Sequence, residues 1–129
     1  MKMKYNEFIL YGLSKHKQII DKIIAELNAY RYNFDIRLIL TEGLTNAFKH
    51  GNNMSINKPI YLKYFYNGSS VKFEIKDCGT GLENVIIDEQ AQDEDLLSDS
   101  GRGLFLIRNL SDKIELKQNT LIVQKCLSI

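Results

Sequence analysis

The chain has 129 residues, which is enough for one domain with a sizeable core but too few for two domains of ordinary size. Hydrophobic residues make up 44% of it and charged residues 26%, the balance of an ordinary globular protein. Seventeen basic residues against sixteen acidic ones give a net charge of +1, so the charge does not point to direct nucleic-acid binding or to an acidic membrane surface.

The cysteines, histidines and apolar runs narrow the class of protein further. Cys78 and Cys126 belong to no CxxC pair, and His16 and His50 are the only histidines, so we expect two free thiols and no zinc site. No apolar run reaches the roughly 18 residues that a membrane span needs, and the run near the start is too short for a signal peptide. We therefore expect a cytoplasmic protein without a membrane segment.

The N-terminal part of the chain predicts a strand and an amphipathic helix. Residues 7–12, EFILYG, form a short apolar run that is typical of a strand. Ser14 is placed to cap a helix that extends to about Tyr30. The apolar residues of this helix recur at helical spacing and are Ile19, Ile20, Ile23, Ile24 and Leu27.

A second helix is predicted after a break at residues 31–34. Asp35 is placed to cap it, and Gly51 to stop it after His50 as the left-handed residue that often closes a helix. Its apolar stripe packs on the sheet and consists of Ile36, Ile39, Leu40, Gly43, Leu44 and Ala47.

Polar side chains gather beside that stripe. Glu42, Asn46 and Lys49 fall on one neighbouring stripe of the helix, and His50 lies between them and the apolar face. Glu42 and Asn46 are one turn apart, so their side chains point at the same small volume. Taken alone, such a group is the ordinary solvated flank of a helix. The below-average helix propensity of asparagine hints that Asn46 belongs to a site.

The periodicity changes to that of strands at Pro59. Residues 59–66 and 71–77 are rich in β-formers, and a loop containing Asn-Gly joins them into a predicted hairpin. The acidic segment 83–100 that follows has little periodicity. For most of its acidic residues, a solvated loop is the simplest interpretation.

The C-terminal part predicts a helix and a second hairpin. Residues 101–110 form the helix, and residues 113–127 form the hairpin, which turns at Gln118-Asn119. This order of elements predicts one α+β domain over residues 1–129. The expected architecture is a two-layer sandwich with the helices on one face of a mixed, mainly antiparallel sheet.

Two glycine-rich segments suggest a ligand. In DCGTG, Asp77 ends a strand, and Gly79 and Gly81 let the backbone approach a flat ligand. The Asp77 carboxylate could accept a hydrogen bond from an exocyclic amine of that ligand. In SGRGLFLI, Gly101 and Gly103 precede an apolar helix, whose N-terminus favours phosphate. A tight turn and a glycine-rich helix start are the simpler alternatives. The second segment fits neither a Walker A loop nor a Rossmann fingerprint.

Taken together, these features could surround one nucleotide, and they resemble a known family. EGLTNAFKHGN resembles the N box of the GHKL ATPase superfamily, which includes gyrase and the histidine kinases, and DCGTG and SGRGLFLI resemble its two glycine boxes. The resemblance implies the histidine-kinase-like ATP-binding fold, also called the Bergerat fold. Within the superfamily the chain is most similar to the anti-sigma-factor serine/threonine kinases, because it has no room for the helix pair of a histidine kinase or the transducer domain of a gyrase.

The resemblance also implies roles for individual residues. Asn46 would hold Mg²⁺, Glu42 would be the general base that deprotonates a substrate serine, and Asp77 would bind the adenine amine of ATP. Residues 83–100 would form a lid. The other residues that the resemblance places at the nucleotide are Lys49, His50, Gly51, Gly79, Gly81, Leu82, Gly101, Arg102, Gly103, Leu104 and Thr120. Asn52 and Asn53 receive no role.

Three functional hypotheses follow. The first is an ATP-dependent serine kinase that binds a sigma factor and phosphorylates an anti-anti-sigma antagonist protein; the resemblance also implies a homodimer. The second is an ATP-binding regulatory module that sequesters a partner without transferring phosphate, and a weaker third is the ATPase subunit of a larger machine. Glu42 favours the kinase, because a module that only binds nucleotide needs no base beside its metal ligand.

Overall fold

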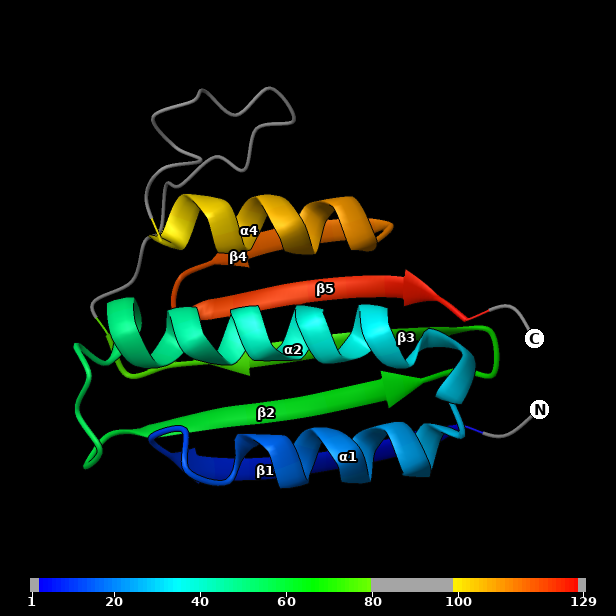
Figure 1. The fold of residues 1–129 in the computed structure, drawn as a ribbon, viewed down its shortest axis with the longest axis horizontal. Helices are drawn as coiled ribbons and strands as arrows, with labels where there is room; N and C mark the ends of the chain where they lie inside the picture. The colour runs from blue at the N-terminus through cyan, green and yellow to red at the C-terminus, as the bar shows by residue number, and fades with distance from the viewer. Residues whose placement is uncertain (1–2, 80–98, 128–129) are drawn as a thin grey trace.

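A computed structural model describes residues 3–79 and 99–127 of the chain (Figure 1). The strands are β1 (Lys4–Tyr11), β2 (Pro59–Tyr66), β3 (Ser70–Lys76), β4 (Lys113–Lys117) and β5 (Thr120–Cys126). The helices are α1 (His16–Leu27), α2 (Asn33–Asn46) and α4 (Asp99–Leu110), with a 3₁₀ turn η1 (Tyr30–Tyr32) before α2 and a π-helical turn η2 (Ala47–Gly51) after it. The predicted order of elements is confirmed.

The strands form one sheet in the order β1-β2-β3-β5-β4, and the three helices lie side by side on one of its faces (Figure 1). The predicted α+β sandwich is therefore confirmed. All four pairings between the described strands are antiparallel, so the sheet is not mixed in this part of the chain. Both predicted hairpins are present, β2–β3 and β4–β5.

The core lies between the sheet and the helices. On β2 and β3 every second side chain is buried, as the two-residue period of a strand requires, and β5 follows the same pattern at Leu121 and Val123. On α1 and α2 the buried side chains recur at helical spacing and match the predicted stripes. The largest fully buried residues include Tyr64, Phe73, Ile20, Ile36, Leu40 and Ile107. No described helix is long and apolar enough to cross a membrane.

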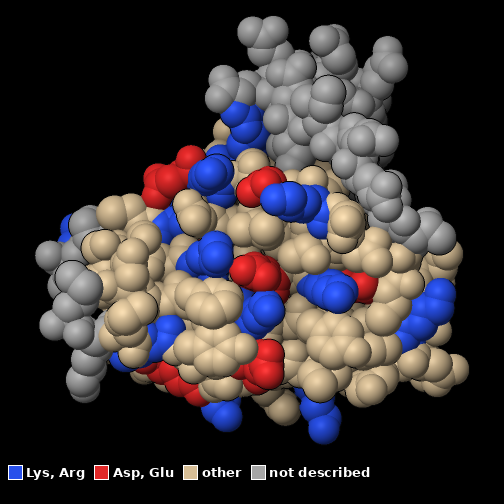
Figure 2. Space-filling model, turned by 180° about the vertical axis from the view of Figure 1, so that it is seen from behind, with Lys and Arg blue, Asp and Glu red and all other residues tan. Residues whose placement is uncertain are grey.

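The other face of the sheet is covered by none of the described helices and combines aromatic and charged side chains. Tyr5 and Phe65 pack together with ring centroids 4.8 Å apart. Glu74 lies 3.8 Å from the Lys63 ammonium and 3.4 Å from that of Lys72. Figure 2 shows this face, on which basic and acidic residues are interspersed rather than segregated. The mixture of charges keeps an otherwise apolar surface compatible with water.

Both predicted N-terminal caps are wrong. Helix α1 begins at His16 with Lys15 in the cap position and no side-chain cap bond, so Ser14 does not cap it. Helix α2 begins at Asn33, which places Asp35 inside its first turn. The Asp35 carboxylate instead lies 3.1 Å from the Lys125 ammonium and ties α2 to β5. The Asp35 side chain therefore forms a long-range ion pair instead of the local cap that the sequence predicts.

The alternation of buried and exposed side chains can be tested with two phenylalanines on neighbouring strands. Phe73 is fully buried, whereas Phe65 faces away from the helices and is 38% exposed. Phe73→Ala should lower the free energy of unfolding by about 3–5 kcal/mol, and Phe65→Ala by about 1 kcal/mol or less. Urea unfolding followed by circular dichroism measures both. Equal losses would mean that the helices do not cover the Phe73 face.

Candidate functional site

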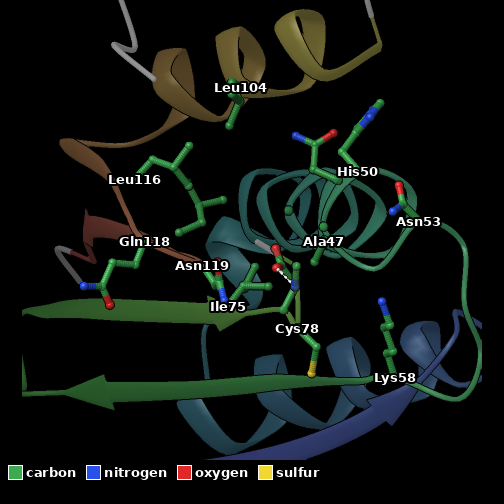
Figure 3. A pocket seen from close by; sticks show the side chains of 16 residues that line it. Ala47, His50, Asn53, Lys58, Ile75, Cys78, Leu104, Leu116, Gln118 and Asn119 are labelled. Atoms are coloured by element: carbon green, nitrogen blue, oxygen red, sulfur yellow. Dashed lines mark hydrogen bonds between the residues drawn. The ribbon is translucent and has the colours of Figure 1, made fainter. Parts of the chain in front are cut away.

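A pocket of about 280 Å³ opens between the C-terminal end of α2, the end of β3 and the β4–β5 hairpin, with α4 above it (Figure 3). Its apolar lining is formed by Gly43, Ala47, Ile75, Leu104, Leu116 and Leu121. Its polar lining comes mainly from Asn46, His50, Asn53, Lys58, Asp77, Gln118 and Asn119. A combination of apolar surface with a limited number of polar groups is the usual composition of a small-molecule site.

Asp77 enters the pocket because of the pleat of β3. Val71, Phe73 and Ile75 point to the core, and Asp77 is the next position in that alternation. Its backbone N–H donates to the carbonyl of Asn119 (3.0 Å), and its Oδ1 accepts from the N–H of Gly79 (2.8 Å). Burial raises the pKa of the Asp77 carboxyl, and the Gly79 bond offsets part of that rise. The pocket thus contains a partly desolvated acceptor.

Two glycines allow the end of α2 to touch the loop after β3. A Cβ added to Gly51 would lie 2.1 Å from Cγ of Asp77, and one added to Gly79 would lie 2.3 Å from the carbonyl oxygen of Gly51. Gly51 does not have the left-handed conformation predicted for it. That conformation occurs at Asn53 (φ 52°) and Met54 (φ 62°). Gly51 is required for close approach, because any side chain there would displace the Asp77 carboxylate.

Asn52 is the buried polar residue that holds this junction together. It is fully buried, and its Nδ2 donates to the carbonyls of Lys58 (3.0 Å) and Pro59 (3.2 Å). Its Oδ1 accepts from the N–H of Cys78 at 2.7 Å. Sequence reasoning gave Asn52 no role, since its partners lie elsewhere in the chain. Its place directly after a helix stop was the only local signal.

Glu42 and Asn46 face the same point on α4. A Cβ added to Gly103 would lie 3.0 Å from Oε2 of Glu42 and 3.1 Å from Nδ2 of Asn46. That Nδ2 is buried and has no hydrogen-bond partner among the described residues. An unsatisfied buried amide costs about 1–3 kcal/mol, which a bound group would recover. The predicted convergence of the two side chains therefore agrees with the structure.

Oxygen ligands of this kind suit a hard divalent cation. Mg²⁺ is usually held by one or two protein oxygens together with waters and substrate phosphates. The Asn46 amide oxygen, at the edge of the pocket and under a residue without a side chain, fits that requirement, and the Glu42 carboxylate beside it adds a negative charge that favours a cation.

The other residues predicted at the site divide into three groups. Residues that line the pocket are Asn46, His50, Gly51, Asp77, Gly79 and Leu104. Glu42, Lys49, Arg102, Gly103 and Thr120 are not among the lining residues, although Glu42 and Gly103 lie next to Asn46 at its edge. Thr120 lies in a hollow on the outer face of the sheet, while its neighbours Asn119 and Leu121 line the pocket. Gly81, Leu82 and most of the predicted lid fall within residues 80–98, outside the described residues.

The second glycine segment differs from its predicted setting. Helix α4 begins at Asp99, so Gly101 and Gly103 lie within the helix rather than ahead of it. Gly103 passes directly over Glu42 and Asn46, where a side chain would crowd both.

Several lining residues were not predicted, namely Asn53, Lys58, Cys78, Gln118 and Asn119. Asn53 and Lys58 lie on one side of the pocket, and Gln118 lies on the opposite side (Figure 3). The thiols of Cys78 and Cys126 are both free and exposed. Asn119 was placed correctly in a turn, but its proximity to Asp77 depends on β3 pairing with β5, which no local pattern reveals.

Comparisons with known proteins agree with this geometry. Residues 16–125 match the histidine kinase-like ATPase domain. The anti-sigma F factor of Anoxybacillus flavithermus is 29% identical over 87 residues, which cover 64% of this chain and 58% of that protein. The anti-sigma F factor of Bacillus mycoides is 29% identical over 89 residues, covering 66% and 60%. The chain thus spans less than two thirds of the length of these relatives.

The raised pKa of Asp77 predicts how stability depends on pH. A carboxyl whose pKa is raised by folding stabilises the protein fully at low pH, and this contribution is lost as the pH rises through the raised pKa. Asp77→Asn should therefore be as stable as the wild type near pH 3 and more stable than it near pH 7. The chain has no tryptophan, so circular dichroism should follow urea unfolding.

Asp21→Asn is the matched control, because Asp21 lies on an exposed surface and pairs with Arg37 at 2.8 Å. It should bring no gain in stability at neutral pH. A loss of stability in Asp77→Asn at neutral pH would show that the ionised carboxylate is favoured by the fold.

Proposed function

Because the chain belongs to the histidine kinase-like ATPase domain family, we propose that residues 1–129 act as one ATP-binding domain and that the pocket beside α2 is its nucleotide site. The observation that carries the proposal is the meeting of the Asn46 and Glu42 side chains under Gly103, at the edge of a pocket that also contains Asp77. The buried Nδ2 of Asn46, which has no partner among the described residues, can in addition donate to a phosphate oxygen. The end that would bind the metal and the end that would bind the nucleobase then belong to one cavity.

The Asp77 end suits adenine. The carboxylate can accept a hydrogen bond from the exocyclic amine, and the flat ring can pack on the side chains of Ala47, Ile75 and Leu121. The Gly79 N–H donates a hydrogen bond to Oδ1 of Asp77 at 2.8 Å, which fixes the orientation of the carboxylate. The phosphates would then extend along α2 towards Asn46 and Gly103.

At the other end, the Asn46 oxygen would hold Mg²⁺, which when bound offsets the negative charge of the phosphates. Glu42 would accept the proton of a substrate serine hydroxyl. As the serine oxygen bonds to the γ-phosphorus, the bond between that phosphorus and the β,γ-bridging oxygen breaks, and ADP leaves with that oxygen. A carboxylate next to the metal ligand is what this transfer requires and what binding alone does not.

The choice of partners is supported by the names of the relatives, which are anti-sigma F factors. We propose that this chain binds a sigma factor and phosphorylates a serine of an anti-anti-sigma protein in the cytoplasm, acting as a homodimer without direct contact to nucleic acid. Phosphorylation of the antagonist would then determine which partner the kinase holds.

One observation favours an ATP-binding module that sequesters its partner without phosphoryl transfer. Among the pocket-lining residues that the structure describes, His50 and Lys58 are the only basic side chains. A scarcity of cations near the triphosphate weakens stabilisation of the transition state more than it weakens binding of the nucleobase.

The metal-binding role is tested by Asn46→Ala. We expect at least tenfold weaker binding of Mg·ATP, because the truncation removes the amide oxygen that would hold the metal. Titration calorimetry with and without Mg²⁺ measures the ATP affinity of each protein. The difference in affinity between the wild type and Asn46→Ala should shrink when the metal is omitted. Asn57→Ala, which removes an exposed amide from the loop before β2, should bind normally. Unchanged affinity in Asn46→Ala would show that the site is misassigned.

The catalytic role is tested by Glu42→Gln. Transfer of labelled γ-phosphate from ATP to candidate anti-anti-sigma proteins should fall about 100-fold or more, while ATP affinity changes by less than about threefold. Glu115→Gln, on β4 but not among the pocket-lining residues, should transfer at the wild-type rate. Nucleotide binding by the wild type without any transfer would support the sequestering module instead.

A further inference from the structure

The Asn52 side chain connects three segments of the chain in the interior. Its Nδ2 reaches the carbonyls of Lys58 and Pro59, at 3.0 and 3.2 Å, where β2 begins. Its Oδ1 accepts from the Cys78 N–H after β3, at 2.7 Å. The backbone N–H of Asn52 closes the π-helical turn by donating to the Ala47 carbonyl at 2.9 Å. A fully buried amide with all these bonds satisfied is a rigid connection.

These bonds act on the peptide next to the Asp77 carboxylate. The N–H of Cys78 belongs to the peptide that follows Asp77, and Asn52 holds it from the side of α2. The N–H of Asp77 itself is held from the side of β5 by the Asn119 carbonyl. With both adjoining peptides fixed, the Cα–Cβ bond of Asp77 has one direction. The Gly79 N–H then sets the rotation of the carboxylate.

We infer that Asn52 is a positioning residue that sets the nucleobase selectivity of the pocket, by fixing the Asp77 carboxylate against the exocyclic amine of the base. This inference rests on the proposed nucleotide site. Asn52 is not among the pocket-lining residues, so it acts only through the Asp77–Gly79 loop. Without Oδ1 of Asn52, the peptide after Asp77 can rotate. The Asp77 carboxylate is then no longer held in the orientation that accepts a hydrogen bond from the exocyclic amine.

The bonding pattern explains why an amide is needed. One end of the side chain must donate to two carbonyls while the other accepts from an N–H, and among short side chains only asparagine does both. An aspartate would place a buried carboxylate against the carbonyls of Lys58 and Pro59. A serine keeps one hydroxyl, which can replace only part of the pattern.

The test compares Mg·ATP with the Mg²⁺ complex of purine riboside triphosphate, which has the same ribose and phosphates but lacks the exocyclic amine. We expect the wild type to bind ATP about 10- to 100-fold more tightly, because the Asp77 acceptor loses its partner in the second ligand. In Asn52→Ala this preference should fall to about threefold or less. The affinity for purine riboside triphosphate should change little.

Two controls separate positioning from loss of stability. Val71→Ala removes a buried side chain from the opposite end of β3 and should lower the melting temperature without changing the preference. Asn52→Ser, which keeps a hydroxyl, should be more stable than Asn52→Ala and retain an intermediate preference. All affinities are measured at a temperature where circular dichroism shows each variant folded.

A double-mutant cycle shows whether Asn52 acts through Asp77. Asp77→Ala alone should abolish the preference, and adding Asn52→Ala should cause no further loss. A folded Asn52→Ala variant with the wild-type preference would overturn the inference and leave the ATP site standing. Absence of binding of both nucleotides to the wild type would overturn the proposed function, and this inference with it.

Discussion

The structure depends on how closely α2 approaches β3. A Cβ added to Gly43 on α2 would lie 2.5 Å from Cδ1 of Ile75, and one added to Gly51 on η2 would lie 2.1 Å from Cγ of Asp77 directly after β3. Because the helix lies this low on the sheet, its last turns form a wall of the pocket. A helix held at the usual side-chain distance would lift Asn46 and His50 away from Asp77.

The polar groups of the candidate site come from different parts of the fold, and under the proposed function they meet different ends of one ligand. Asp77 is placed by the pleat of β3, whereas Glu42 and Asn46 are placed by the helical repeat of α2. Gly103 of α4 passes over the last two without a side chain, so no Cβ crowds them. Under the proposed function, three elements that share one core hold the acceptor for the nucleobase, the metal ligand and the general base in fixed relation, and phosphoryl transfer depends on such positioning.

The sequence predicts what depends on local periodicity. The apolar stripe of α2, the β2–β3 hairpin and the turn between β4 and β5 follow from it. The position of Glu42 and Asn46 on the same face of α2 follows from it as well. Long-range contacts decide the rest. Asp35 is paired with Lys125 instead of capping α2. Gly51 is required by Asp77 and not by a left-handed turn, and the burial of Asn52 depends on strands that no local pattern brings together.

The junction around Asn52 also bears on how a ligand would leave. The α2 wall and the β3 wall are joined by buried hydrogen bonds and by contacts at Gly51 and Gly79 that leave no slack. The opposite wall, formed by Leu104 on α4 and by Leu116 and Gln118 on the β4–β5 hairpin, is mainly apolar, and apolar contacts impose no fixed direction. The residence time of a bound molecule should therefore be governed by movement of that second wall, while the first serves as a fixed template.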